Sequence, residues 1–124
     1  MRHYDRLLAW QECHKLTLQV YRATQSYPKH ELYGLTSQAR RASVSAGVNI
    51  VEGSAKKGPS EFRRYLDISL GSLSELSYLL RLSHELGFLG EADWCALDAQ
   101  QNRARFMTWK LYQAMTNAKK GAPR

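Results

Sequence analysis

The sequence predicts an all-α protein that folds as an antiparallel up-down-up-down four-helix bundle, and three observations predict it. Leu, Ala, Glu, Gln, Lys and Arg, which lose little side-chain entropy in a helix, dominate the 124 residues. Apolar residues recur at steps of three and four in four successive stretches, and patterns typical of strands are nearly absent. The connections between the stretches are short, which favours antiparallel neighbours. We therefore expect one domain around a single core.

The first two helices are predicted over residues 7–27 and 36–53. The first ends before Pro28, because a proline disfavours helical geometry in the residue that precedes it. Its apolar stripe consists of Leu7, Trp10, Cys13, Thr17, Val20 and Thr24, widened by Leu16 and Tyr21. The stripe of the second helix is made mostly of small residues, namely Leu35, Ala39, Ala42, Ala46, Asn49 and Gly53. Small side chains let backbones approach closely, so this helix is expected to be the most central, with Gly53 as its C-terminal stop.

The third and fourth helices are predicted over residues 60–86 and 91–119, with a loose tail at about 119–124. The stripe of the third helix comprises Phe62, Leu66, Ser69, Leu73, Leu76, Leu80 and Ser83, and that of the fourth comprises Trp94, Leu97, Ala104, Met107, Leu111 and Met115. Further leucines and large aromatic side chains exceed what a lone bundle of this size needs to fill its core. Because aromatic residues are enriched at interfaces, this excess predicts a homo-oligomer.

Composition also limits the setting of the protein. The apolar runs are shorter than the ~20 residues of a membrane-spanning helix, and the first residues do not form a secretion signal. We therefore expect a cytoplasmic protein without a membrane partner. Cys13 and Cys95 lie far apart and match no metal-binding or redox spacing, so both are expected to be small buried hydrophobic residues.

Motifs for catalysis are weak throughout the sequence. The four histidines have no partner at the spacing of metal ligands, and no nucleophile motif surrounds a serine. The segment 53–58 contains two glycines but lacks the spacing of a phosphate-binding P-loop. We expect no catalytic site, no cofactor and no metal.

One set of polar residues shares a face of the second helix. Arg41, Ser45, Asn49 and Glu52 stand at steps of four, four and three. They could form a polar binding site with a cation, a hydroxyl, an amide and a carboxylate. The favoured interpretation is a hydrogen-bonded seam that fixes the register of helices or subunits.

The chain resembles a known family in motifs that cover most of the first three helices, in the expected order and spacing. These motifs are Leu8-Ala9-Trp10-Gln11, Tyr27-Pro28 with Glu31, Tyr33-Gly34-Leu35-Thr36, Gln38-Ala39-Arg40-Arg41-Ala42-Ser43-Val44-Ser45, Asn49-Ile50-Val51-Glu52-Gly53 and Gly71-Ser72-Leu73-Ser74-Glu75-Leu76. They are similar to motifs of the four-helix-bundle proteins encoded in intervening sequences of bacterial 23S ribosomal RNA genes. The sequence departs from the family pattern at Gly47, which should cost about 1 kcal/mol of helix stability relative to alanine.

This resemblance implies a four-helix bundle and, for relatives, a ring-like homopentamer. It implies no established reaction. More distant relatives are accessory proteins of diversity-generating retroelements, which bind nucleic acid and a reverse transcriptase.

The charges separate along the chain. The net charge of +7 divides into +4 over residues 36–66, −5 over 67–99 and +6 over 100–124, with the remainder at the start. In an up-down-up-down bundle, the N-terminus, the second connection and the C-terminus share one end. Basic residues that collect at this end are Arg2, Arg6, Lys56, Lys57, Arg63, Arg64, Lys119, Lys120 and Arg124. The bundle is therefore expected to be basic at one end and acidic at the other.

We predict that the basic residues bind RNA or DNA through phosphates, largely without sequence preference. The candidate contacts are Arg40, Lys56, Lys57, Arg63, Arg64, Lys119 and Lys120. A ring would present several basic ends on one face and strengthen binding through multivalency. The alternative is an assembly scaffold that docks another protein, with the charge serving only solubility.

Overall fold

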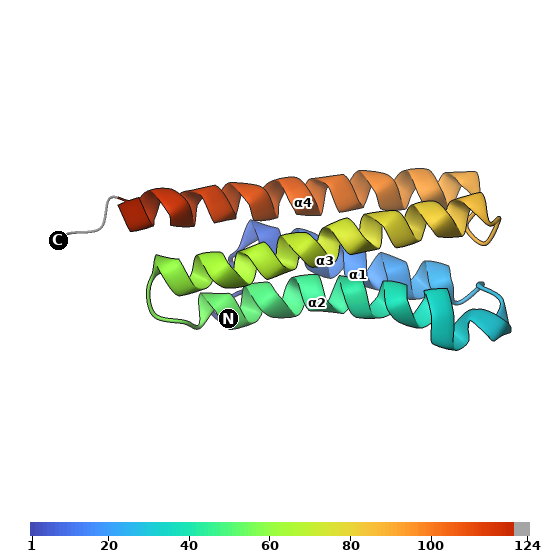
Figure 1. Cartoon of the computed structure of the whole chain (residues 1–124), viewed down its shortest axis with the longest axis horizontal. Coiled ribbons are helices and arrows are strands. Elements are labelled where there is room, and N and C mark those ends of the chain that lie inside the picture. Colours follow the sequence, from blue (N-terminus) through green and yellow to red (C-terminus); the bar gives the residue numbers. More distant parts are fainter. Residues whose placement is uncertain (121–124) are drawn as a thin grey trace.

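Four helices form the computed structural model, which describes residues 1–120 and the side chains up to Ala118. The helices are α1 (Leu8–Thr24), α2 (Ser37–Ser54), α3 (Pro59–Glu85) and α4 (Glu91–Lys120). They run alternately in opposite directions, with α4 and α2 on opposite sides of the bundle (Figure 1). Packing follows chain order, and α4 also packs on α1. The predicted all-α up-down-up-down bundle is confirmed.

Leucines from α3 fill the centre of the core. Leu66, Leu73, Leu76 and Leu80 are all buried, as their stripe predicts. The stripe of α1 is rotated from the predicted one. Leu16 lies at its centre with no exposed surface, whereas Trp10 and Thr17 lie at its edge and Tyr21 is exposed. Apolar residues cover more than half the circumference of α1, so periodicity alone leaves the direction of the core ambiguous.

Helix α1 ends at Thr24, three residues before the predicted end. The Thr24 hydroxyl donates a hydrogen bond to the Val20 carbonyl at 2.8 Å, a contact that bends helices. Tyr27 then leaves the helical path and is buried beside Phe88, with ring centroids 6.0 Å apart. The connection continues through a short 3-10 turn at Lys29–Glu31. Burial of Tyr27 therefore decides where the first helix ends.

Gly53 does not stop α2, contrary to the sequence prediction, because the helix continues to Ser54. Its role is close packing against α3. A Cβ atom at position 53 would lie 2.7 Å from Cβ of Tyr65 and 2.9 Å from the ring of Phe62. The actual turn lies at Gly58, whose φ of +87° favours glycine, and Pro59 then begins α3.

Four hydrogen bonds from side chains to backbone carbonyls join each helix to its two neighbours, and we call them the belt. Its donors and acceptors are the Thr17 hydroxyl and Ser43 carbonyl (3.1 Å), the Ser69 hydroxyl and Ala46 carbonyl (2.8 Å), the Gln101 amide and Leu73 carbonyl (3.1 Å), and the Gln100 amide and Glu12 carbonyl (3.0 Å). The belt therefore links all four helices through polar side chains at their contacts.

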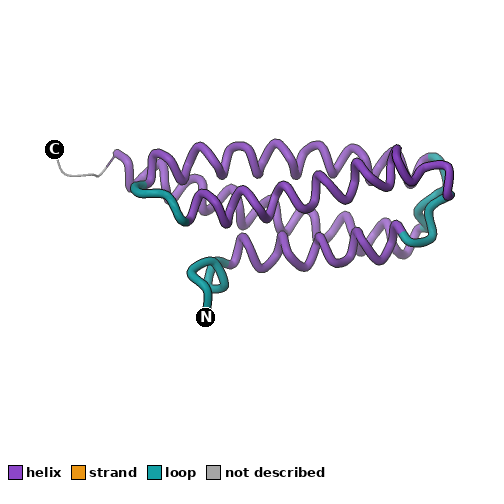
Figure 2. The backbone as a smooth tube through the Cα atoms, turned by 90° about the horizontal axis from the view of Figure 1, so that it is seen from below, coloured by secondary structure: helices purple, strands orange, loops and turns teal. Residues whose placement is uncertain are grey.

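The start of the chain and the last turn of α4 lie toward the same end of the bundle, where the α2–α3 connection also lies (Figure 1). Seen from below, residues before α1 form a loop that projects from the side of the bundle (Figure 2). The helix α4 includes Lys119 and Lys120, and the rest of the predicted tail, residues 121–124, falls outside the described residues. None of the helices in the described chain is long and apolar enough to cross a membrane.

Candidate nucleic-acid interface

Four cations lie together at the end that carries the termini. Lys56 and Lys57 belong to the connection between α2 and α3, and Arg63 and Arg64 belong to the first turns of α3. Both lysines and Arg64 are exposed, and Arg63 is half-buried. The short connection holds the lysines next to the arginines. We call these four residues the basic end.

Two tyrosines lie among these cations. Lys56 Nζ and the Arg64 guanidinium carbon lie 5.5 and 4.7 Å from the ring centroid of Tyr65. Arg63 lies 5.6 Å from the ring centroid of Tyr112 and donates a hydrogen bond to its hydroxyl at 3.3 Å. These contacts hold the long basic side chains against aromatic surfaces. Less side-chain entropy is then lost when an anion binds.

An acidic residue neutralises part of the basic end. Arg64 donates a hydrogen bond to the Glu61 carboxylate at 2.9 Å, which holds the pKa of Glu61 below its usual range. The pair is exposed, and pairs of this kind contribute little to stability. Lys56, Lys57 and Arg63 are not in ion pairs within the described residues. These three are therefore the cations most available to a phosphate.

The structure separates Arg40 from the basic end, contrary to the predicted group. Arg40 lies near the start of α2, sixteen residues before Lys56, which is about 24 Å along a helix axis. Its Nε donates a hydrogen bond to the Thr24 hydroxyl at 2.9 Å, and its guanidinium lies 4.8 Å from the Tyr21 ring. Arg40 therefore joins α2 to α1. Lys119 and Lys120 lie in the last turn of α4, and their side chains are outside the described part.

The predicted polar face of α2 divides into an inner pair and an outer pair. The Asn49 amide donates to the Ser45 carbonyl at 2.8 Å, and the Ser45 hydroxyl lies 2.8 Å from that of Ser72 on α3. Arg41 and Glu52 are exposed instead. The structure thus places two of the four residues in a hydrogen-bonded contact between α2 and α3, and two on the surface.

A buried carboxylate that sequence analysis missed lies between α1 and α4. The Glu12 side chain is only 11% exposed and accepts hydrogen bonds from the Gln100 amide at 3.0 Å and from Lys15 Nζ at 3.1 Å. The bond from Gln100 and the charges of Lys15 and Arg103 lower the pKa of Glu12. The glutamines were a signal, because positions 100 and 101 fall within the apolar stripe between Leu97 and Ala104. This carboxylate is part of the packing and not of the basic end.

The two cysteines differ in their surroundings. Cys13 is buried, and desolvation raises the pKa of its thiol to about 11. Cys95 is exposed, contrary to the prediction, since it lies two residues before the buried Leu97 and so points to the opposite side of α4. Neither thiol is activated, because the pKa of Cys95 is also raised, by partial desolvation and by Glu91. Within residues 1–120, no group of three or more His, Cys, Asp or Glu residues could hold a metal ion.

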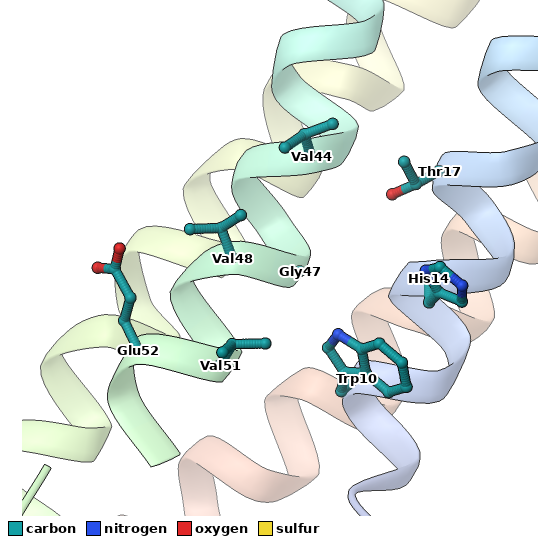
Figure 3. A pocket seen from close by; sticks show the side chains of 8 residues that line it. All are labelled: Trp10, His14, Thr17, Val44, Gly47, Val48, Val51 and Glu52. Carbon is teal, nitrogen blue, oxygen red and sulfur yellow. The ribbon is translucent and has the colours of Figure 1, made fainter. Parts of the chain in front are cut away.

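A groove follows the line between α1 and α2 (Figure 3). Its cavity has a volume of about 330 Å³ and is lined by Trp10, His14, Thr17, Val44, Gly47, Val48, Val51 and Glu52. The rings of Trp10 and His14 are stacked with centroids 4.9 Å apart, which keeps the indole against α1. The groove is apolar except at the His14, Thr17 and Glu52 side chains, so it is unsuited to bind phosphates.

Comparison with known families identifies the chain. The profile of the 23S rRNA-intervening sequence protein family matches residues 5–110. The chain belongs to this family. The match covers helices α1 to α3 entirely and two thirds of α4, and it includes Lys56, Lys57, Arg63 and Arg64. It ends before Lys119 and Lys120.

A solved structure supports the fold of this 23S rRNA-intervening sequence protein. The chain is similar to a crystal structure of a protein with unknown function from the S23 ribosomal protein family of Bacteroides thetaiotaomicron, with a TM-score of 0.76. The two sequences are 15% identical over 86% of this chain and 99% of the other. At this identity the similarity establishes the fold alone. No curated protein shows a significant match.

Proposed function

We propose that this protein is a cytoplasmic, non-catalytic homo-oligomer that binds RNA or DNA electrostatically through its basic end. The observation that supports the proposal is the cluster of Lys56, Lys57, Arg63 and Arg64 at one end of the bundle. Phosphates are the anions that such a cluster fits, because each contact releases condensed counterions from the nucleic acid.

The aromatic neighbours of the cations add to this argument. Tyr65 and Tyr112 hold three of the four cations in defined positions. A hollow of about 250 Å³ at this end is lined by the carboxylates of Glu61 and Asp67 as well as by Ser60, Arg63, Arg64 and Tyr112, so Lys56 and Lys57, which do not line it, are the cations least offset by acidic side chains. Binding is therefore expected to follow the phosphate backbone and to depend weakly on sequence.

A ring of copies would strengthen this binding. A single basic end offers few phosphate contacts, and parallel copies on one face would act together as a multivalent surface. The pentamer that the family resemblance implies is one such arrangement. The remaining alternative is a scaffold for another protein, in which the cations only keep the protein soluble.

The test compares two double variants with the same charge change at opposite ends. Lys56→Glu with Lys57→Glu alters the basic end, and Arg22→Glu with Lys29→Glu alters exposed cations near the far end of α1. Retention by a structured RNA and by duplex DNA is measured across a salt series. We expect the first variant to lower the slope of log affinity against log salt by about two, and the control to change it little.

Two outcomes contradict the proposal. Absence of binding by the natural chain at low salt would leave the scaffold alternative. Equal losses in the two variants would show that only the total charge matters. Light scattering on the same samples establishes whether both variants keep the oligomeric state of the natural chain.

A further inference from the structure

Helix α4 carries an exposed aromatic pair on its outer face. Ala104 and Thr108 face the core and are fully buried, so Phe106 between them points outward and is 56% exposed. Trp109 follows three residues later and is 45% exposed. Lys110 lies beside the pair, with its Nζ 5.5 Å from the Phe106 ring centroid. Two large aromatic side chains one turn apart, rimmed by a cation, form a projecting apolar surface that we call the knob.

The α1–α2 groove is the complementary hollow. Val44 and Val48 line it and remain 38% and 43% exposed, although they belong to the helix with the smallest side chains. Gly47 contributes no side chain, so the floor of the groove is backbone (Figure 3). Glu52, at one end of the groove, is exposed. The groove is therefore an apolar hollow with the negative charge of Glu52 at one end. The knob is an apolar projection with the positive charge of Lys110 beside it.

The knob and the groove lie on different sides of the bundle and at overlapping heights. Helix α4 packs on α1 and α3, and α2 lies across the bundle from it (Figure 1). Along the axis, Gln100 contacts Glu12 and Thr108 contacts Cys13. Phe106 lies between Gln100 and Thr108 along α4. The residues that these two contact, Glu12 and Cys13, belong to the stretch of α1 that lines the groove. A copy that presents its knob to a neighbour's groove would therefore need little displacement along the axis.

We propose that Phe106 and Trp109 of one copy occupy the α1–α2 groove of the next copy. The proposal rests on the self-association in the proposed function and names its contact surfaces. Because the two surfaces differ, the contact is heterologous, and it closes a ring where each step adds a rotation about the bundle axis without axial displacement. Every bundle in that ring points the same way, so all basic ends share one face. Glu52 and Lys110 supply opposite charges at the edge of the contact.

The test uses one variant for each surface. Phe106→Asp with Trp109→Asp removes the knob, and Val44→Asp with Val48→Asp blocks the groove; all four positions are exposed. We expect the natural chain to exceed the monomer mass by light scattering and each variant alone to be monomeric, with self-association weakened at least tenfold. An equimolar mixture should give a heterodimer of twice the monomer mass and nothing larger, because one intact knob meets one intact groove and the other pair is blocked.

Circular dichroism establishes that each variant keeps its helix content, and Val48→Lys alone replaces the groove variant if the double change unfolds it. A monomeric natural chain, variants that keep its mass, or a mixture that stays monomeric would each overturn the proposal. Variants that keep their mass but lose retention of single-stranded RNA would show instead that the aromatic pair binds bases. RNA binding that is unchanged in the Lys56 and Lys57 variant, with an unchanged mass, contradicts only the proposed function, and this contact stands.

Discussion

Helix α2 meets its two neighbours in opposite ways, and two of its glycines show the difference. A Cβ atom at Gly53 would lie 2.7 Å from Cβ of Tyr65 on α3, whereas one at Gly47 would lie 3.9 Å from the indole nitrogen of Trp10 on α1. The first glycine is required by close packing. The second leaves space beside it and forms the floor of a groove. A small residue in a helix therefore indicates close packing only when a neighbour occupies the space that it leaves.

The largest expected effect is at the contact between α2 and α3, where Gly53 is closely packed. Gly53→Ala should lower the free energy of unfolding by about 2 kcal/mol, because α3 must move to admit the methyl group. Gly71→Ala on the exposed side of α3 is the control, since its Cβ meets nothing within 4 Å, and it should raise stability by about 1 kcal/mol. Urea denaturation measures both. A Gly53→Ala protein as stable as the natural one would mean that the two helices separate without cost.

The contact between α1 and α4 is closely packed, unlike the contact between α1 and α2, and it contains the buried carboxylate of Glu12. Glu12→Gln should lower the free energy of unfolding at pH 7 by about 1.5 kcal/mol, through loss of charge-assisted hydrogen bonds. The folded state lowers the pKa of Glu12 below its ordinary 4.5, so the stabilisation is present above that pH and disappears as the pH falls through the folded value. The two stability curves should converge as the pH falls below the lowered pKa of Glu12 in the folded state. Parallel curves from pH 3 to 7 would contradict this account.

The α1–α2 groove should accommodate a methyl group at position 47, whereas the close packing against α3 does not accommodate one at position 53. Gly47→Ala should raise the free energy of unfolding by about 1 kcal/mol and the midpoint of thermal unfolding by about 4 °C, through helix propensity alone. Thermal denaturation at two protein concentrations separates this gain from any effect on self-association. A decrease in stability would show that the groove is narrower than the structure indicates.

The smallest effects are expected at the outer members of the predicted polar face. Arg41→Ala and Glu52→Ala should each change the free energy of unfolding by less than about 0.5 kcal/mol, since both side chains are exposed. Asn49→Ala is the comparison, because its amide donates to Ser45 and its loss should cost more. A loss above 1 kcal/mol at either outer position would restore the idea of a four-residue seam.

The sequence predicted the fold well because apolar periodicity and short connections leave one simple arrangement. The stripe of α3 and the burial of Ala39, Ala42, Ala46 and Gly53 in α2 agree with the structure. The predicted stripe of α1 is correct at Cys13, Val20 and Thr24, but its centre is shifted to Leu16, because Leu16 and Trp10 are both apolar and only tertiary packing selects between them. The end of α1 was also missed, because burial of Tyr27 depends on Phe88, which is distant in sequence.

The candidate site was predictable where residues are neighbours along the chain, and less so elsewhere. Lys56 and Arg63 could be placed at one end because a short connection joins α2 to α3. Arg40 was included among the nucleic-acid contacts on charge alone, although a helix of 18 residues separates it from the basic end. The contact of Arg63 with Tyr112 joins positions 49 residues apart, and periodicity contains no information about such a pair.

A contact between two side-chain hydroxyls, those of Ser45 on α2 and Ser72 on α3, reduces a difficulty that small residues create for the bundle. Ala39, Ala42 and Ala46 present nearly the same surface at successive turns, so α2 displaced by one turn would bury almost as much apolar area as the native arrangement. Such misaligned states would be close in energy and would trap folding chains. Backbone carbonyls recur at each turn and would remain available to the belt, but the Ser45 hydroxyl on α2 would lose the Ser72 hydroxyl on α3, which lies 2.8 Å from it in the native alignment. A few polar atoms thereby give one alignment an energy gap over its copies.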